Sequence, residues 1–120
     1  MEKASGDKFK GTVLLTEFAG ACLLMLAYNL QGENMNVTLL AYFVIVSSTY
    51  LVSGGHLNPS ITVGVYVSEK EYYHNVCYMF LIIVMQTFGC LLALGFGYIL
   101  RVTVNVQGTD EKYLEPNVYA

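Results

Sequence analysis

The sequence predicts an all-α membrane protein with three spanning helices and one short re-entrant helix that enters the bilayer without crossing it. Hydrophobic residues make up 55% of the chain and charged residues 12%, against about 25% charged in soluble domains. Three long apolar segments cover residues 12–30, 37–52 and 76–100. Between the second and the third lies a shorter segment, residues 53–67, whose helical part is too short for a hydrocarbon core that needs about 20 residues.

The first apolar segment, residues 12–30, follows a polar stretch, residues 1–11, that we expect to be a solvated tail. The segment is long enough to span and Glu17 interrupts its apolar run, so we interpret it as a spanning helix and not as a cleaved signal peptide. An ionisable group inside a span implies a buried partner. Glu17 also lies near the end of the span, so an interfacial carboxylate is the alternative interpretation.

The other two long segments differ in length. Residues 37–52 suffice as a span if the helix continues toward Ser53, and residues 76–100 can span with some tilt. Gln86, in the middle of the third segment, is expected to brace loop backbone rather than to bind a solute. Residues 101–120 contain no span and are interpreted as a loop or tail. Small residues let membrane helices approach closely, and we expect this of Gly20, Gly64, Gly89, Gly95 and Gly97.

The short segment, residues 53–67, has an irregular first part and a helical second part. Asn58 is a favoured N-cap and Pro59 suits the first helical position, so a helix is predicted to begin at Asn58 or Pro59. Irregular backbone at membrane depth is tolerated only where it is buried in protein or lines a watery cavity. The segment is therefore predicted to be re-entrant.

The chemistry of this segment favours small neutral polar solutes. A helix that begins near the bilayer midplane directs the positive end of its dipole into the cavity and repels cations. The NH₂ group of Asn58 can donate a hydrogen bond to a solute, and the carbonyl groups of residues 54–57 can accept one.

The same residues carry a family resemblance. Residues 53–64, Ser-Gly-Gly-His-Leu-Asn-Pro-Ser-Ile-Thr-Val-Gly, resemble the first Asn-Pro-Ala box of the aquaporin or major intrinsic protein family, with Ser60 in place of alanine. Residues 16–20, Thr-Glu-Phe-Ala-Gly, resemble the start of that family's first helix, and residues 86–89, Gln-Thr-Phe-Gly, resemble its Gln-x-x-Gly motif. The resemblance covers about residues 12–100 and implies the N-terminal half of a fold built from two inverted three-span halves.

The resemblance implies a channel that passes water or small neutral solutes such as glycerol and excludes ions, with Asn58 at the pore centre. It implies that Glu17 accepts hydrogen bonds that brace the re-entrant loop. His56 is expected near the cytoplasmic mouth of the pore, and a buried histidine bonded to a backbone carbonyl is the alternative. The residues that it places at the pore are Gly55, His56, Leu57, Asn58, Pro59 and Ser60.

The outer constriction is the least defined part of the expected channel. If the chain aligns with the family without a gap, Thr38 lies where water-selective members carry an aromatic side chain, and a threonine would widen the constriction. If the helix is shifted, Tyr42 or Phe43 takes this place.

A different class of function is also open: a non-conducting half-aquaporin that serves as a structural subunit of a larger membrane complex. Expected partners are the lipid bilayer and a second aquaporin half or other membrane subunits, with a homotetramer expected if the other half exists. The net charge of −3 argues against a nucleic-acid partner. No nucleophile, paired carboxylate or metal-ligand cluster stands out, so we predict no enzyme, cofactor or metal, and the three cysteines are interpreted as apolar packing residues.

The basic residues predict the orientation of the chain. Lys3, Lys8, Lys10 and Lys70 lie on one side of the predicted spans, whereas Arg101 and Lys112 lie on the other. Because cytoplasmic loops carry the excess of lysine and arginine, the N-terminus is predicted to be cytoplasmic.

Overall fold

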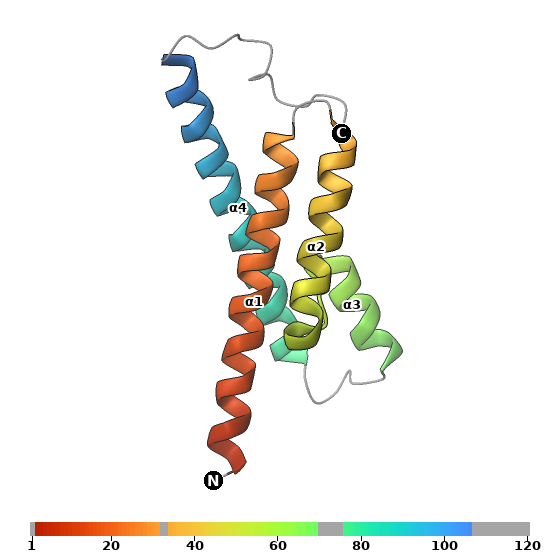
Figure 1. The fold of residues 1–120 in the computed structure, drawn as a ribbon. Coiled ribbons are helices and arrows are strands. Elements are labelled where there is room, and N and C mark those ends of the chain that lie inside the picture. The colour runs from red at the N-terminus through yellow and green to blue at the C-terminus, as the bar shows by residue number, and fades with distance from the viewer. Residues whose placement is uncertain (1, 32–33, 70–75, 107–120) are drawn as a thin grey trace.

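The computed structural model describes residues 2–31, 34–69 and 76–106, and within them the side chains of residues 10–31, 34–69 and 76–103. This part of the chain forms four helices and no strand (Figure 1). The helices are α1 (Glu2–Leu30), α2 (Met35–Ser53), α3 (Pro59–Ser68) and α4 (Val76–Val106). The stretches Lys10–Leu30, Met35–Ser53 and Val76–Thr103 are long and apolar enough to cross a membrane. The predicted all-α class with three spans is therefore confirmed.

Two of the long helices extend beyond the expected spans. α1 begins at Glu2, well before Thr12, because several of the preceding polar residues are good helix formers. In Figure 1 these first turns of α1 reach past the beginning of α4. α4 continues past Leu100 to Val106. The predicted loop around Lys70 and the end of the predicted tail, residues 107–120, lie outside the described residues.

The ends of α2 and α3 follow from local sequence. The side chain of Asn34 caps α2 by accepting a hydrogen bond from the Asn36 N–H at 3.2 Å, and α2 ends where Gly54 adopts the left-handed conformation with φ 82°. α3 has Asn58 as its N-cap and Pro59 as its first residue. The predicted start of the short helix is thus confirmed.

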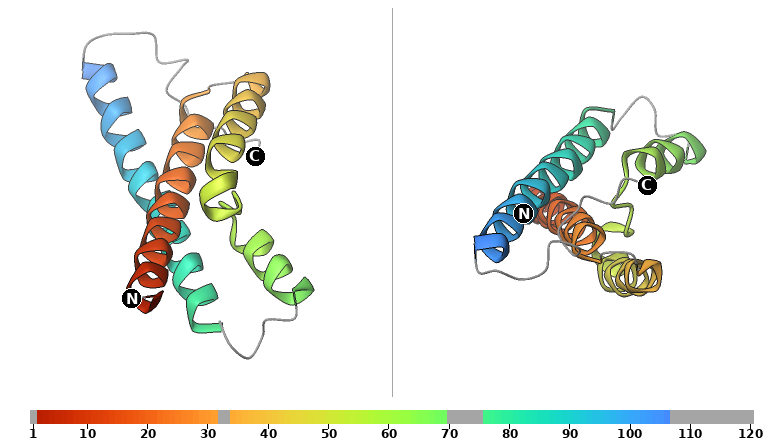
Figure 2. Two further views of the ribbon diagram at one scale, coloured as in Figure 1. Left: turned by 60° about the horizontal axis from the view of Figure 1, so that its bottom comes forward. Right: turned by 90° about the horizontal axis from the view of Figure 1, so that it is seen from above.

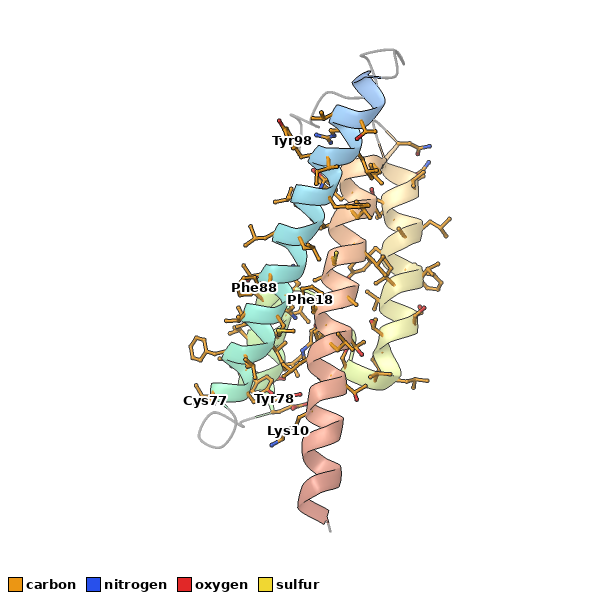
Figure 3. The ribbon with its side chains drawn as sticks, turned by 90° about the vertical axis from the view of Figure 1, so that its left-hand side faces the viewer. Lys10, Phe18, Cys77, Tyr78, Phe88 and Tyr98 are labelled. Atoms are coloured by element: carbon orange, nitrogen blue, oxygen red, sulfur yellow. The ribbon has the colours of Figure 1, made fainter. Side chains whose placement is uncertain are left out.

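α1 is the central helix of the bundle. It contacts both α2 and α4, and the view from above in Figure 2 shows it between them. α1 and α4 run in the same direction, as two hydrogen bonds between their corresponding ends show. The Tyr78 hydroxyl donates to the Lys10 carbonyl at 3.2 Å, and Arg101 Nη2 donates to the Asn29 carbonyl at 3.0 Å. Figure 3 shows Lys10 and Tyr78 together at one end.

The glycines divide into two groups. A Cβ atom at Gly89 would meet the backbone of Phe18 on α1, and one at Gly20 would meet the side chain of Leu57, so both are close-packing positions as predicted. Gly64 and Gly95 make no such contact within the described residues, because no atom of another described segment lies within 4 Å of the position of a Cβ. These two glycines are exposed. At Gly97 a Cβ would make only an ordinary contact, at 3.7 Å from Asn29.

Candidate functional site

The connection from α2 to α3 turns on three residues in the left-handed region. Gly54, Gly55 and Leu57 have φ values of 82°, 62° and 51°. This conformation is uncommon for leucine. Leu57 retains it with a side chain that is buried, at 5% exposure, against Gly20 of α1. The loop therefore folds back onto α1 instead of continuing α2.

The side chain of Glu17 on α1 binds backbone N–H groups of this loop. Its Oε1 accepts a hydrogen bond from the His56 N–H at 3.1 Å, and its Oε2 accepts one from the Leu57 N–H at 2.7 Å. The Glu17 side chain is completely buried. Within the described residues, its hydrogen-bond partners are neutral N–H groups, which replace water around the carboxylate.

Gln86 and Thr62 complete a buried polar network. Gln86 Nε2 donates to Glu17 Oε2 at 2.7 Å and to Thr62 Oγ1 at 3.0 Å, and Thr62 Oγ1 donates to the Asn58 carbonyl at 3.1 Å. Gln86 and Thr62 are 1% and 0% exposed. One side chain from each of α1, α3 and α4 thus joins a single buried network next to the loop.

The first turn of α3 is exposed, in contrast to the buried network of Glu17, Thr62 and Gln86. Asn58, Pro59 and Ser60 are all exposed. Asn58 Oδ1 accepts a hydrogen bond from the Ser60 N–H at 2.8 Å. Because the oxygen of the amide is used in this cap, the NH₂ group is the part of the side chain that remains to donate to another molecule.

The loop before Asn58 offers acceptors. Its N–H groups at Gly55, His56 and Leu57 donate within the protein, to Ser53 Oγ and to Glu17. In the part of the chain that the structure describes, no hydrogen bond uses the carbonyl groups of residues 54–57. His56 is half-buried, and its Nδ1 has no hydrogen-bond partner among these residues. The alternative interpretation, a buried histidine bonded to a backbone carbonyl, is therefore not seen at Nδ1 within the described residues.

Comparison with known families matches residues 3–120 to the family described as Major intrinsic protein. The chain belongs to this family. Neither curated proteins nor solved structures provide a match. Proteins of this family are membrane channels of the aquaporin or glycerol-facilitator type, not enzymes, and they are typically oligomeric. This major intrinsic protein is accordingly an integral membrane protein, as its three apolar helices also indicate.

The structure brings together most of the predicted site residues of this major intrinsic protein. Glu17 accepts hydrogen bonds from His56, Leu57 and Gln86, and the Asn58 carbonyl is joined to Gln86 through Thr62. Gly55 precedes these residues in the loop, and Pro59 and Ser60 follow in α3. Thr38 lies apart, in the first turns of α2. At about 1.5 Å of rise per residue, it is about 24 Å along α2 from Gly54, where the loop begins. Its Oγ1 is buried and has no partner within the described residues.

Sequence reasoning missed Thr62 of this major intrinsic protein. Its position four residues after the N-cap Asn58 was an available signal, because a threonine hydroxyl in a helix can bond the carbonyl four residues earlier. Its second contact, with Gln86, carried no such signal because it depends on how α3 packs on α4.

Proposed function

We propose that this major intrinsic protein conducts water or small neutral solutes such as glycerol past the N-terminal end of α3 and excludes ions. The observation that carries the proposal is the state of the Asn58 amide. Its oxygen is used in the cap of α3, at 2.8 Å from the Ser60 nitrogen, and its exposed NH₂ group can donate to a passing oxygen atom.

Exclusion of cations follows from the charge at this position. The N-terminus of a helix carries a partial positive charge equivalent to about half an elementary charge, which repels cations. Residues 53–67 contain no aspartate, glutamate, lysine or arginine that would offset or add to it. The buried carboxylate of Glu17 is turned to backbone N–H groups and to Gln86. A cation would therefore lose its hydration without gaining a counter-charge.

The acceptors for a neutral solute would be the loop carbonyl groups. Those of residues 54–57 are used in no hydrogen bond among the described residues, while Asn58 supplies the donor. We place Gly55, His56 and Leu57 before Asn58 along the solute path, with Pro59 and Ser60 beside it. Ser60 adds a hydroxyl where the family's motif has alanine. Thr38 is proposed as a residue of the outer constriction.

A complete pore needs a second wall opposite the exposed first turn of α3. We propose that a second aquaporin-type half provides it, either in the same protein or as another subunit. If the same protein carries that half, we propose that it assembles as a homotetramer. The N-terminus and the end of α3 are proposed to face the cytoplasm, as the distribution of lysine and arginine favours.

A non-conducting structural subunit is the second candidate. It is favoured by α2, in which no residue is buried, and by large exposed side chains such as Phe43 and Leu51. Surfaces of this kind can be covered by helices of a larger complex as well as by lipid.

Flux measurements on vesicles that contain the purified protein separate these candidates. The wild type is expected to increase osmotic water permeability over protein-free vesicles. Asn58→Asp places a negative charge at the α3 N-terminus and is expected to raise cation leak relative to water flux. Asn36→Asp, at an exposed asparagine at the start of α2, is the matched control and is expected to behave as the wild type. A wild type no more permeable than empty vesicles would favour the structural subunit, and an unchanged flux ratio in Asn58→Asp would remove Asn58 from the pore.

A further inference from the structure

Thr62 is the one described residue of α3 that is buried. The short helix meets α4 along a narrow face, and most of its other side chains are exposed. A helix held in this way has little apolar contact to fix its position. The polar contacts of Thr62 therefore carry more weight than they would in a helix packed on several sides.

The Thr62 hydroxyl donates one hydrogen bond and accepts another. It donates to the Asn58 carbonyl at 3.1 Å and accepts a hydrogen bond from Gln86 Nε2 at 3.0 Å. The Thr62 N–H donates to the same carbonyl at 3.0 Å. The carbonyl of Asn58 is thus held by two groups of Thr62, and one of them is itself held by α4.

These bonds close a ring around Asn58. On one side, the N–H of the preceding residue, Leu57, is bound to Glu17 Oε2 at 2.7 Å. On the other side, the Asn58 carbonyl is linked through Thr62 and Gln86 back to the same oxygen, Glu17 Oε2. The ring fixes the backbone of Asn58 on both sides, and the cap to the Ser60 N–H then fixes its side chain.

We propose that Thr62 is the positioning residue for Asn58, and that its hydroxyl keeps the Asn58 NH₂ group directed at the solute path. The effect of Thr62 on permeation rests on the proposed function, whereas its effect on the position of Asn58 rests on the ring of hydrogen bonds alone. Removal of the hydroxyl breaks the link between the Asn58 carbonyl and Gln86 Nε2. The hydrogen bond from the Leu57 N–H to Glu17 stays in place. Gln86 Nε2 then keeps one of its two partners.

The test compares Thr62→Val, Thr62→Ser and Thr87→Val in the full chain in lipid bilayers. Valine matches threonine in shape but lacks the hydroxyl, whereas serine keeps it. Thr87 is the matched control, because it is an exposed threonine of α4 whose hydroxyl bonds only the Ile83 carbonyl of its own helix, at 2.8 Å. Two readouts are needed: the nitrogen-15 NMR signal of the Asn58 side-chain NH₂ group, and the osmotic permeability of vesicles.

Thr62→Val is expected to shift and broaden the Asn58 NH₂ signal and to lower the permeability by at least about threefold, because the variant loses both hydrogen bonds of the hydroxyl. Thr62→Ser and Thr87→Val are expected to match the wild type in both readouts. The inference is overturned if Thr62→Val leaves the Asn58 signal unchanged. It is equally overturned if Thr62→Ser is as impaired as Thr62→Val, because the methyl group and not the hydroxyl would then be responsible.

The two readouts also separate this inference from the proposed function. A wild type that does not raise permeability would contradict the channel, while the NMR signal would still decide whether Thr62 positions Asn58. A wild type that conducts, with an Asn58 signal insensitive to Thr62→Val, would retain the channel and reject the positioning role.

Discussion

Glu17 is a carboxylate with no exposed surface in a helix that spans the membrane. A buried charge is tolerated only when hydrogen bonds replace its lost hydration. Glu17 accepts three, from the His56 N–H, the Leu57 N–H and Gln86 Nε2. Two of these donors are backbone groups of the loop, and among the described residues Glu17 is their hydrogen-bond partner. The carboxylate and the loop are therefore expected to stabilise each other.

Replacement of Glu17 by glutamine tests this dependence. Glu17→Gln keeps the size of the side chain but turns one acceptor into an NH₂ group that faces N–H donors. The free energy of unfolding in detergent micelles, followed by circular dichroism, is expected to fall by about 2–4 kcal/mol. Glu69→Gln, at an exposed glutamate, is the control and is expected to change it by less than about 0.5 kcal/mol. Equal stability of the two variants would show that the loop does not depend on the carboxylate.

The residues of the site differ in how far the sequence indicates them. Glu17 and Gln86 stand out because a charged group and an amide are rare within apolar segments. Thr62 does not stand out, because threonine is unremarkable in a short apolar helix. Its role depends on the packing of α3 against α4, which brings the Gln86 amide within 3.0 Å of its hydroxyl. No spacing within the sequence determines that distance.

Among the described helices, α1 and α4 share the most extensive contact. It is tied by the Tyr78 hydroxyl at one end and by Arg101 at the other, where the guanidinium caps a carbonyl in the last turn of α1. Between these ends, Gly89 lets the backbone of α4 approach that of Phe18 on α1. This approach also brings Gln86, one turn earlier in α4, to Glu17.

Two glycines of α4 give a matched pair of variants. Gly89→Ala puts a methyl group against the α1 backbone and is expected to destabilise the protein by about 1–3 kcal/mol. Gly95→Ala adds a methyl group in open space and is expected to stabilise the helix by about 0.5–1 kcal/mol. Both changes are measured as free energies of unfolding in the same detergent. A loss of stability in both variants would contradict the assignment of Gly89 as the contact point.

At the level of the helices, sequence signals fixed some boundaries and not others. The start of α3 was predictable, because Asn58 and Pro59 are both specific to helix N-termini. The start of α1 was not, because polarity marks the end of a membrane span but not the end of a helix. Nor did glycine content reveal which faces meet: Gly89 lies in a contact and Gly95 does not, although both occur in the same apolar helix.

The described part of the molecule has a small interior that is unusually polar. Its buried hydrophobic residues are few and include two alanines, whereas its largest fully buried side chains are Gln86, Glu17 and Thr62. Most large apolar side chains are exposed, Leu51 at 88%. In lipid, apolar side chains gain little by leaving the surface, and close packing and hydrogen bonds hold helices together. The interior is thus built around the network that supports the Asn58 loop.

Water permeability and ion conductance, measured on the same vesicles that contain the wild-type protein, test the proposed channel itself. We predict osmotic permeability above that of protein-free vesicles, with cation and proton conductance no higher than theirs. Permeability equal to that of protein-free vesicles, or water flux accompanied by ion conductance, would contradict the proposed channel for neutral solutes.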